Sequence, residues 1–226
     1  MFFAVIVLLA AVSYIPSSYT VTVNAAVPTT KPANVETIDE STVVSKESAE
    51  STELSEIAYD TDARTVPFYS QFADISAPEW RKIGCGIVSL AMLIDFYKPT
   101  IAVDALLKEG IEKGAYVHDA GWSHAGLIAL AEDHGLTGEA RYLTDLNMTA
   151  AFDDLKAAIK EGPVMASVHY TFEPTNPIPH LVVVTDIDDE GVHYNDPAEE
   201  SGGGVITAEK FQNSWKKRYI EIRPAT

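Results

Sequence analysis

An α+β fold is predicted from the order in which two apolar patterns occur along the 226-residue chain. Between residues 85 and 162, apolar side chains recur at the three- and four-residue spacing of a helix face. From residue 163 onward, the apolar residues form short runs separated by turn-forming residues, which is typical of antiparallel strands. Helices followed by an antiparallel sheet define α+β organisation.

The first predicted helix begins at Cys85. Its apolar residues keep helical spacing until Pro99, which cannot continue a helix. We expect this helix to lie in the core and to pack against the sheet. Three further helices with apolar faces are predicted over residues 103–113, 123–135 and 147–162.

The predicted strands lie mainly in the last third of the chain. Residues 65–71, TVPFYSQ, are expected to form a short strand-like piece that is interrupted by Pro67. The remaining elements are buried strands over 163–170 and 180–187, a turn over 188–191, a returning strand over 191–196, a short helix over 208–215 and a last strand over 218–222.

Three parts are predicted along the chain. Residues 1–26 carry no charged side chain, and their apolar core of about 14 residues is typical of an export signal. A membrane span needs roughly 20 such residues. Residues 27–62 are rich in Ser, Thr and Glu and carry nine acidic against two basic side chains, so we expect a disordered linker. Residues 63–226 form the predicted folded domain, which is long enough for one core.

This organisation predicts a protein that works outside the cytoplasm. The N-terminal segment is expected either to be cleaved near Ala25 or Ala26, which releases a secreted protein, or to stay as an anchor at the cell envelope. The formal net charge is −17, from 16 basic and 33 acidic side chains. Such a charge repels phosphate backbones and anionic membrane surfaces, so nucleic acid is not expected as a partner.

Cys85 is the only cysteine of the chain, so it cannot form an internal disulfide. It stands between Gly84 and Gly86 at the predicted start of a helix. The unpaired backbone N–H groups at such a position favour a thiolate over a thiol. The two glycines are expected to let a substrate approach the sulfur closely. Cys85 is therefore a candidate nucleophile, and the alternative is a small buried side chain at a helix start.

A cysteine nucleophile needs a histidine and a group that orients it. His180 begins a predicted strand, and Asp196 lies sixteen residues later, at the end of the returning strand. A hairpin of that length brings its two ends together. Regular alternation around the predicted turn places Asn195, not Asp196, on the face of His180, whereas a bulge at Gly191 restores Asp196. Both residues are candidates for the orienting group.

Five short motifs carry a family resemblance: VPFYSQ at residues 66–71, GCGIVSLAML at 84–93, GPVMASV at 162–168, HLVVVTDI at 180–187 and NDP at 195–197. In this order and spacing, they resemble the C39-like branch of the papain-like cysteine peptidases. The resemblance covers roughly residues 65–222. It implies a papain-like fold, in which the nucleophile helix of an N-terminal helical part packs on an antiparallel sheet.

The same resemblance implies the roles of four residues. Cys85 would be the nucleophile, His180 the general base and acid, Asp196 the group that orients His180, and Gln71 a donor in the oxyanion hole. The implied activity is that of an exported cysteine peptidase, a hydrolase that acts on a peptide or protein substrate without a metal or other cofactor. The alternatives are a catalytically inactive C39-like module that binds peptides or cell-envelope components, and an acyl transferase that uses the same Cys-His pair.

Other polar and aromatic residues are weaker candidates. His118, Asp119 and His124 have no third or fourth ligand at zinc spacing, so we expect solvated loop residues and no metal site. Residues 186–191 partly match a calcium loop but lack its closing glutamate, so a turn is expected there. The three tryptophans are expected in the core rather than along a cleft: Trp80, Trp122 and Trp215.

Overall fold

The computed structural model describes residues 65–118 and 121–225 of the chain. The predicted export segment, the acidic linker and the predicted start of the domain at residue 63 lie outside these residues. Within the part that the structure describes, no helix is both long enough and apolar enough to cross a membrane.

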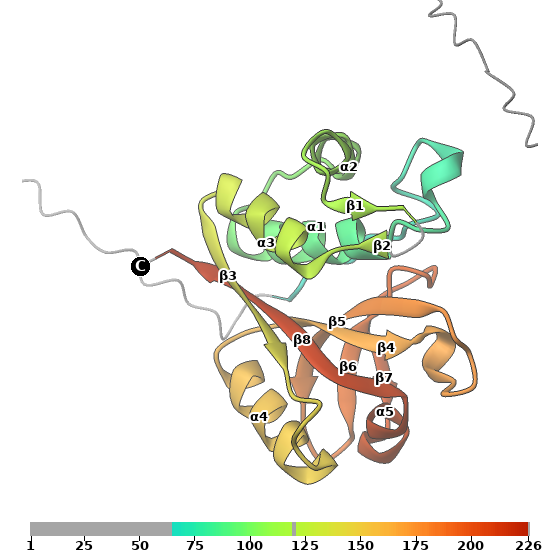
Figure 1. Cartoon of the computed structure of the whole chain (residues 1–226), viewed down its shortest axis with the longest axis vertical. Coiled ribbons are helices and arrows are strands. Elements are labelled where there is room, and N and C mark those ends of the chain that lie inside the picture. The colour runs from blue at the N-terminus through green and yellow to red at the C-terminus, as the bar shows by residue number, and fades with distance from the viewer. Residues whose placement is uncertain (1–64, 119–120, 226) are drawn as a thin grey trace, which may run out of the picture. The chain divides into compact units, whose positions relative to one another are not determined.

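A six-stranded sheet forms the centre of the described structure, and all of its neighbouring strands are antiparallel. The strand order is β3-β8-β4-β5-β6-β7, so the C-terminal strand is inserted between two earlier ones (Figure 1). The six strands are β3 (Leu136–Tyr142), β4 (Val164–His169), β5 (Pro179–Ile187), β6 (Val192–Asn195), β7 (Gly204–Ile206) and β8 (Trp215–Pro224).

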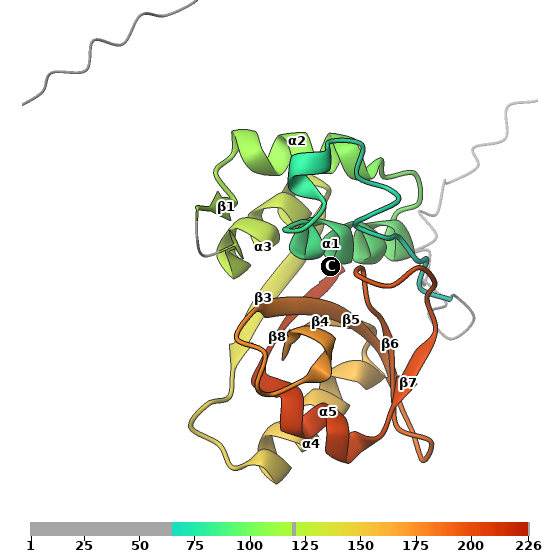
Figure 2. The ribbon, with the colours of Figure 1, turned by 90° about the vertical axis from the view of Figure 1, so that its right-hand side faces the viewer.

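Helices cover both faces of this sheet. The helices α1, α2 and α3 lie over one face, and α4 and α5 lie over the other (Figures 1 and 2). A two-stranded hairpin, β1 and β2, lies beside α3. The remaining elements are α1 (Cys85–Tyr97), α2 (Val103–Glu112), α3 (His124–Asp133), α4 (Met148–Lys160), α5 (Ala208–Ser214), the short 3-10 helices η2 (Pro78–Trp80) and η3 (Tyr170–Phe172), β1 (Tyr116–Val117) and β2 (Gly121–Trp122).

The two layers of helices create two hydrophobic cores, one on each side of the sheet. Strand β5 contributes to both, because Leu181 and Val183 pack with α1, whereas Val182 and Val184 pack with α4 and α5. Successive side chains of a strand point to opposite faces. A strand that is buried on both faces therefore needs an almost unbroken apolar run, which is what residues 180–187 provide.

Helix α1 is buried around nearly its whole circumference, and only Cys85 and Asp95 among its residues are partly exposed. It lies between the sheet and the helices α2 and α3. The hydroxyl of Ser89 donates a hydrogen bond to the backbone oxygen of Leu181 at 3.2 Å, which fixes α1 against β5. This contact places the start of α1 next to the start of β5.

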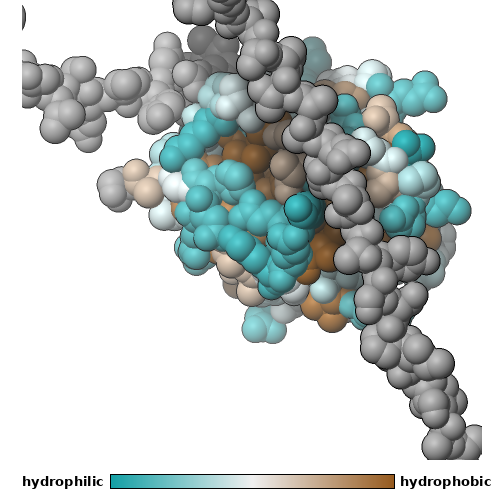
Figure 3. Space-filling model, turned by 90° about the horizontal axis from the view of Figure 1, so that it is seen from above, coloured by the Kyte–Doolittle hydropathy of each residue, from teal (hydrophilic) through white to brown (hydrophobic). Residues whose placement is uncertain are grey.

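Helix α2 forms the outer layer on that side and is amphipathic. Its residues Val103, Leu106 and Leu107 are buried against α1, whereas Asp104 and Lys108 face solvent. Seen from above, this side of the molecule is mostly hydrophilic, with apolar side chains visible between the polar ones (Figure 3).

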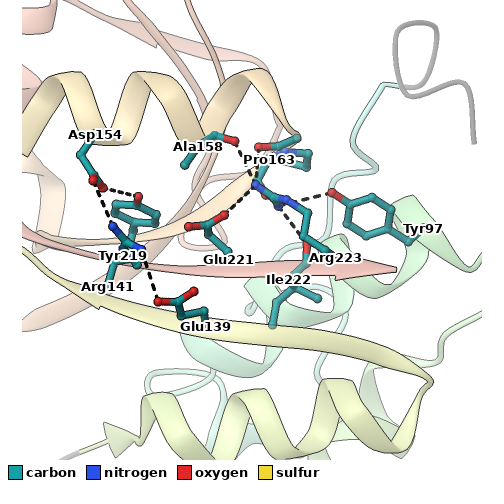
Figure 4. Close-up of polar contacts among 11 residues, drawn as sticks. Tyr97, Glu139, Arg141, Asp154, Ala158, Pro163, Tyr219, Glu221, Ile222 and Arg223 are labelled. Atoms are coloured by element: carbon teal, nitrogen blue, oxygen red, sulfur yellow. Dashed lines mark hydrogen bonds and ion pairs between the residues drawn. The ribbon is translucent and has the colours of Figure 1, made fainter. Parts of the chain in front are cut away.

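The opposite layer is held to the sheet by polar contacts as well as by its core. Asp154 of α4 binds Nη2 of Arg141 at 3.1 Å and accepts a hydrogen bond from the hydroxyl of Tyr219 at 2.5 Å (Figure 4). Arg223 donates to the backbone oxygens of Ala158 and Pro163 at 3.0 and 2.8 Å. These contacts join β3 and β8 to the helix α4 and to the loop that follows it.

The predicted α+β class is confirmed, with the helix after Cys85 packed on an antiparallel sheet. The predicted helices and the strands over 163–170, 180–187, 191–196 and 218–222 are present, with ends that shift by a few residues. The prediction of a strand-like piece over 65–71 is wrong. These residues form no strand and lead into a turn at Gln71. The strands β1, β2, β3 and β7 were not predicted.

Candidate active site

The predicted nucleophile and base lie next to each other at the sheet side of α1. Cys85 is the first residue of α1, is half-buried, and follows Gly84, which provides no side-chain cap for the helix. His180 is the second residue of β5 and is buried. The thiol of Cys85 and the imidazole of His180 are close enough to shift each other's pKa, that of the thiol downward and that of the imidazole upward. The arrangement can therefore pass a proton between sulfur and nitrogen.

The second nitrogen of His180 binds a carboxylate. Nε2 of His180 lies 2.6 Å from Oδ1 of Asp196, and the two side chains are only 3% and 5% exposed. The same carboxylate oxygen accepts the backbone N–H of Ala198 at 2.8 Å. The ring of Tyr170 packs edge-on against the imidazole, with the ring centres 5.1 Å apart. His180 is thus held in one orientation from two sides.

The hairpin register explains why Asp196, not Asn195, contacts His180. Regular alternation places Asp196 opposite Val183, but the structure pairs Asn195 with Val183, because the register shifts between Val184 and Asp186. That shift moves Asp196 to the face of His180. The bulge therefore lies near Thr185 on β5 and not at Gly191, where the sequence analysis placed it.

Asn195 has a different set of partners. Its Oδ1 accepts the backbone N–H of Gly203 at 2.9 Å, and its Nδ2 donates to the backbone oxygen of Val66 at 3.3 Å. These contacts tie the segment before Gln71 to the end of β6. Asn195 thus joins two loops and does not touch the imidazole.

The surroundings of the Cys85–His180 pair favour its charged form. Burial raises the pKa of the Cys85 thiol, but the hydrogen bond and the charge of His180 outweigh burial, so the pKa lies below its ordinary value. Burial lowers the pKa of His180, yet the hydrogen bonds and charges of Asp196 and Cys85 raise it above the ordinary value. The pair is stabilised as a thiolate and an imidazolium.

Gln71 lies beside the same thiol. It is buried, its backbone N–H donates to the backbone oxygen of Pro197 at 2.7 Å, and its side chain lines the cavity that holds Cys85. Among the described residues, no group forms a hydrogen bond with its Oε1. The amide oxygen of Gln71 therefore has an unused acceptor, whereas the oxyanion-hole role implied by the sequence would use the amide N–H groups.

The glycines on both sides of Cys85 serve packing. A Cβ atom on Gly86 would lie 2.7 to 2.9 Å from side-chain atoms of Trp122, and one on Gly84 would lie 2.2 Å from Cδ1 of Ile75. Contacts between carbon atoms are favourable only from about 3.5 Å. The space at both glycines is filled by these neighbours and is closed to a substrate, which corrects the expectation that they open access to the sulfur.

The cavity beside Cys85 has a volume of about 820 Å³, which is within the usual range for a ligand site. His180 and Gln71 also line it, and Trp122 forms part of its wall. Its rim carries four large hydrophobic side chains that are exposed to solvent: Phe72, Ile83, Tyr142 and Ile178.

The weaker candidates of the sequence are accounted for separately. His118 lies in the exposed turn after β1, Asp119 lies outside the described residues, and His124 is not a loop residue but the half-buried first residue of α3. No group of three or more His, Cys, Asp or Glu residues in the described part of the chain could hold a metal ion. Asp188 accepts two backbone N–H groups of the turn after β5, from Glu190 and Gly191.

The tryptophans were expected in the core. Trp122 and Trp215 are buried there, and Trp80 is half-buried against it. Trp122 also lines the cavity.

Four further residues of the cavity could not be recognised as neighbours from the sequence. Tyr142, Ser167 and Arg218 line it together with His124, and they come from three different strands and one helix. No motif connects them in the sequence. Only the strand order β3-β8-β4, in which three sequence-distant segments become neighbours, brings them together.

Helix α1 begins at a cysteine and packs on an antiparallel sheet, and the second residue of the neighbouring strand β5 is a histidine bound to a carboxylate. This arrangement defines a papain-like fold. Residues 63–221 match the model of the Peptidase_C39 like family. The chain therefore belongs to this family of C39-like peptidases.

Solved structures show the same fold. A double glycine motif protease from an AMS/PCAT transporter, in complex with its leader peptide, is 24% identical with a TM-score of 0.50, and the match covers 71% of this chain and 93% of that chain. A C39-like peptidase from Bacillus anthracis is 20% identical with a TM-score of 0.53, and the match covers 71% of this chain and 96% of that chain. No curated protein matches this chain.

Proposed function

We propose that the protein is an exported cysteine peptidase that cleaves peptide or amide bonds by attack of the Cys85 thiolate. The observation that carries this proposal is the buried relay from Cys85 through His180 to Asp196, with 2.6 Å between the last two side chains. A lone structural cysteine requires no such relay, because a neutral thiol packs as a small hydrophobe. Export is supported by the apolar first 26 residues of the sequence.

In the first half of the reaction, the thiolate of Cys85 attacks the carbonyl carbon of the substrate and forms a tetrahedral intermediate. The negative charge moves to the carbonyl oxygen, which the backbone N–H of Cys85 and the side-chain amide of Gln71 stabilise. The imidazolium of His180 then gives its proton to the leaving nitrogen. The C–N bond breaks, an amine leaves, and the acyl group stays on sulfur as a thioester.

In the second half, His180 is neutral and takes a proton from a water molecule that attacks the thioester. The C–S bond breaks, the acid product leaves, and the proton restores the imidazolium beside the thiolate. Asp196 keeps Nε2 of His180 protonated throughout, so that Nδ1 faces the sulfur. It acts as a positioning residue, because its contacts are with His180 and Ala198.

The proposed substrate is a peptide or protein segment. Support comes from the cavity beside Cys85, whose exposed hydrophobic rim offers a surface for side chains that flank the scissile bond. A leader peptide is the ligand of the double glycine motif protease that shares the fold. Because that likeness is at 24% identity, we carry over only the class of ligand.

A fluorescent electrophilic probe for nucleophilic cysteines tests the proposal. The wild-type protein is expected to be labelled at Cys85 at neutral pH, and His180→Ala is expected to reduce the labelling rate at least about tenfold, because the thiol loses the partner that lowers its pKa. His134→Ala is the matched control, since His134 binds Glu109 away from the cavity. Equal labelling of the wild type and His180→Ala would overturn the proposal.

A further inference from the structure

The charge of the Cys85 cavity is opposite to that of the chain. Acidic side chains outnumber basic ones by 33 to 16 in the whole sequence. The cavity, however, is lined by Lys82 and Arg218, and no Asp or Glu is among its described lining residues. Lys82 is exposed to solvent at the rim, whereas Arg218 is half-buried inside. The charges of the Cys85–His180 pair cancel each other, so the net interior charge of this cavity comes from Arg218.

Arg218 is also unusual among the four arginines of the described residues. Arg141 and Arg223 bind carboxylates and backbone oxygens, as Figure 4 shows, and Arg81 binds two backbone oxygens. In the described part of the chain, the guanidinium of Arg218 has no such partner, and its Nε is buried without a hydrogen bond. A buried donor that lacks a partner costs free energy, and more so when it is charged. A ligand that accepts hydrogen bonds from Arg218 would remove that cost.

The register of β8 places Arg218 on the cavity side of the sheet. Arg218 pairs with Tyr142 of β3 in regular alternation with Ile220, which packs on the α1 side. The backbone just before Arg218 is irregular. In the pairing of β4 with β8, Ala166 lies opposite Tyr219 and Val168 opposite Trp215, so three residues of β8 bulge out against one of β4. Lys217, in the middle of the bulge, has a φ of 50°, in the left-handed region that is unfavourable for a residue with a side chain.

Side chains near Arg218 complete a polar end of the cavity. The ring of His124 stacks on Tyr142 with 5.5 Å between the ring centres, and its Nε2 lies 3.3 Å from the hydroxyl of Ser167. Its Nδ1 is buried and has no hydrogen-bond partner among the described residues. Burial and the positive charge of Arg218 lower the pKa of His124, which favours its neutral form. This end of the cavity thus offers one fixed positive charge and neutral polar groups.

We propose that Arg218 binds a carboxylate of the substrate, and that the protein therefore selects peptides with an acidic group close to the scissile bond. This inference rests on the proposed peptidase function. The planar guanidinium matches a carboxylate in a two-hydrogen-bond arrangement. A Glu or Asp side chain and the free carboxyl terminus of a peptide both offer this group, so the test has an arm for each.

The first arm compares two peptide vinyl sulfones that differ only in Glu or Gln at one of the two positions before the electrophile. The rate of Cys85 modification is measured by intact mass on the full chain. The wild type is expected to react about tenfold or more faster with the Glu probe than with the Gln probe, because hydrogen bonds to a charged group contribute a free energy of this size. Arg218→Met is expected to remove this preference, so that the two probes react at similar rates, whereas Arg218→Lys keeps part of the preference.

The second arm measures how well a tripeptide with a free carboxyl terminus protects Cys85 from the Gln probe, compared with its carboxamide. If the tripeptide acid protects Cys85 and its carboxamide does not, and this protection is lost in Arg218→Met, the carboxylate that Arg218 binds is the terminus of the substrate. Lys82→Met is the matched control, because Lys82 is the other cation of the cavity and is exposed. Lys82→Met is expected to change the Glu-over-Gln preference and the acid-over-carboxamide protection by less than about twofold, because a surface charge is screened by solvent and salt.

The outcomes separate this proposal from the proposed function. A wild type that reacts in a His180-dependent way, but equally with acidic and neutral ligands in both arms, overturns the role of Arg218 and leaves the peptidase proposal standing. Lys82→Met removing the selectivity as fully as Arg218→Met would also overturn it. A wild type that reacts with neither probe, or reacts equally after His180→Ala, contradicts the proposed function itself.

Discussion

At the scale of single residues, the central question is how a buried thiolate and imidazolium are stabilised. Burying two charges is costly unless further hydrogen bonds satisfy them. The backbone N–H groups of Gly86 and Leu181 lower the pKa of Cys85 together with His180, and so stabilise the thiolate. The imidazolium is satisfied on its other side by Asp196, whose carboxylate is in turn held by Ala198. Each charge of the pair thus has partners beyond the other charge.

The first prediction concerns the pH profile of Cys85 alkylation by iodoacetamide. Only the thiolate reacts, and the pKa of Cys85 is lowered, chiefly because His180 outweighs burial. The reaction should stay appreciable at pH 6, where a free thiol with a pKa near 8.5 is under about 1% ionised. It should fall only at lower pH, when the pair takes up a proton. His180→Ala should move the midpoint of the profile upward, and a wild-type midpoint near 8.5 would contradict the ion pair.

The second prediction separates Asp196 from its neighbour Asn195. Asp196→Ala removes a group that raises the pKa of His180, so the Cys85 profile should move upward, but less than in His180→Ala. Its kcat should fall by a factor on the order of 10², within the range of positioned acid–base groups. Asn195→Ala is the matched variant: it breaks contacts to Val66 and Gly203 and should lower the melting temperature with the profile unchanged. The reverse pattern would make Asn195 the orienting group.

At the scale of elements, the sequence predicts a helix or strand well where one apolar pattern dominates. It predicts poorly the elements that are defined only by pairing with another strand. Helix α1 and strand β5 were predictable because burial on all sides or on both faces demands continuous apolar residues. Strand β3 was not predictable from the sequence, because it is an edge strand whose residues are mostly half-buried or exposed. Only its pairing with β8 defines it. The bulge near Thr185 likewise depends on neighbouring strands, so the sequence left Asp196 and Asn195 open.

The irregular start of β8, just before Arg218, was beyond sequence reasoning for the same reason. Its segment, WKKRY, shows neither alternation nor a turn signal, and its bulge appears only when β8 pairs with β4. Lys217 supports the bulge by donating to the backbone oxygens of Thr144 and Leu146, both at 2.7 Å. An irregular strand that binds a distant loop in this way has no local pattern.

The third prediction concerns the packing of α1 against Trp122. Gly86→Ala would place a Cβ within 2.9 Å of three side-chain atoms of Trp122. Overpacking of this kind costs about 1 to 3 kcal/mol, while replacing a helical glycine by alanine returns up to about 1 kcal/mol. We expect the free energy of unfolding to fall by about 1 to 2 kcal/mol in urea denaturation. Ala105→Gly, at an exposed site of α2, measures the propensity effect alone. An unchanged or higher stability of Gly86→Ala would contradict the tight contact.

At the scale of the whole molecule, the division of the chain remains a proposal. We propose that residues 63–226 form the folded domain, that residues 27–62 form a linker, and that residues 1–26 direct export. The family match over residues 63–221 supports the start of the domain. The acidic composition of residues 27–62 supports a solvated linker, since few apolar side chains are present to offset the entropy of ordering.

The fourth prediction follows from this division. A chain that starts at residue 63 should melt within about 3 °C of the chain that starts at residue 27, because an unpacked linker contributes little to stability. A chain that starts at residue 69 is the sensitivity control. It lacks Val66, which is buried in the core, and two backbone acceptors of Asn195, so its melting temperature should fall clearly. If removing residues 27–62 lowers the melting temperature as much as removing residues 27–68, the acidic segment packs on the domain and is not a linker.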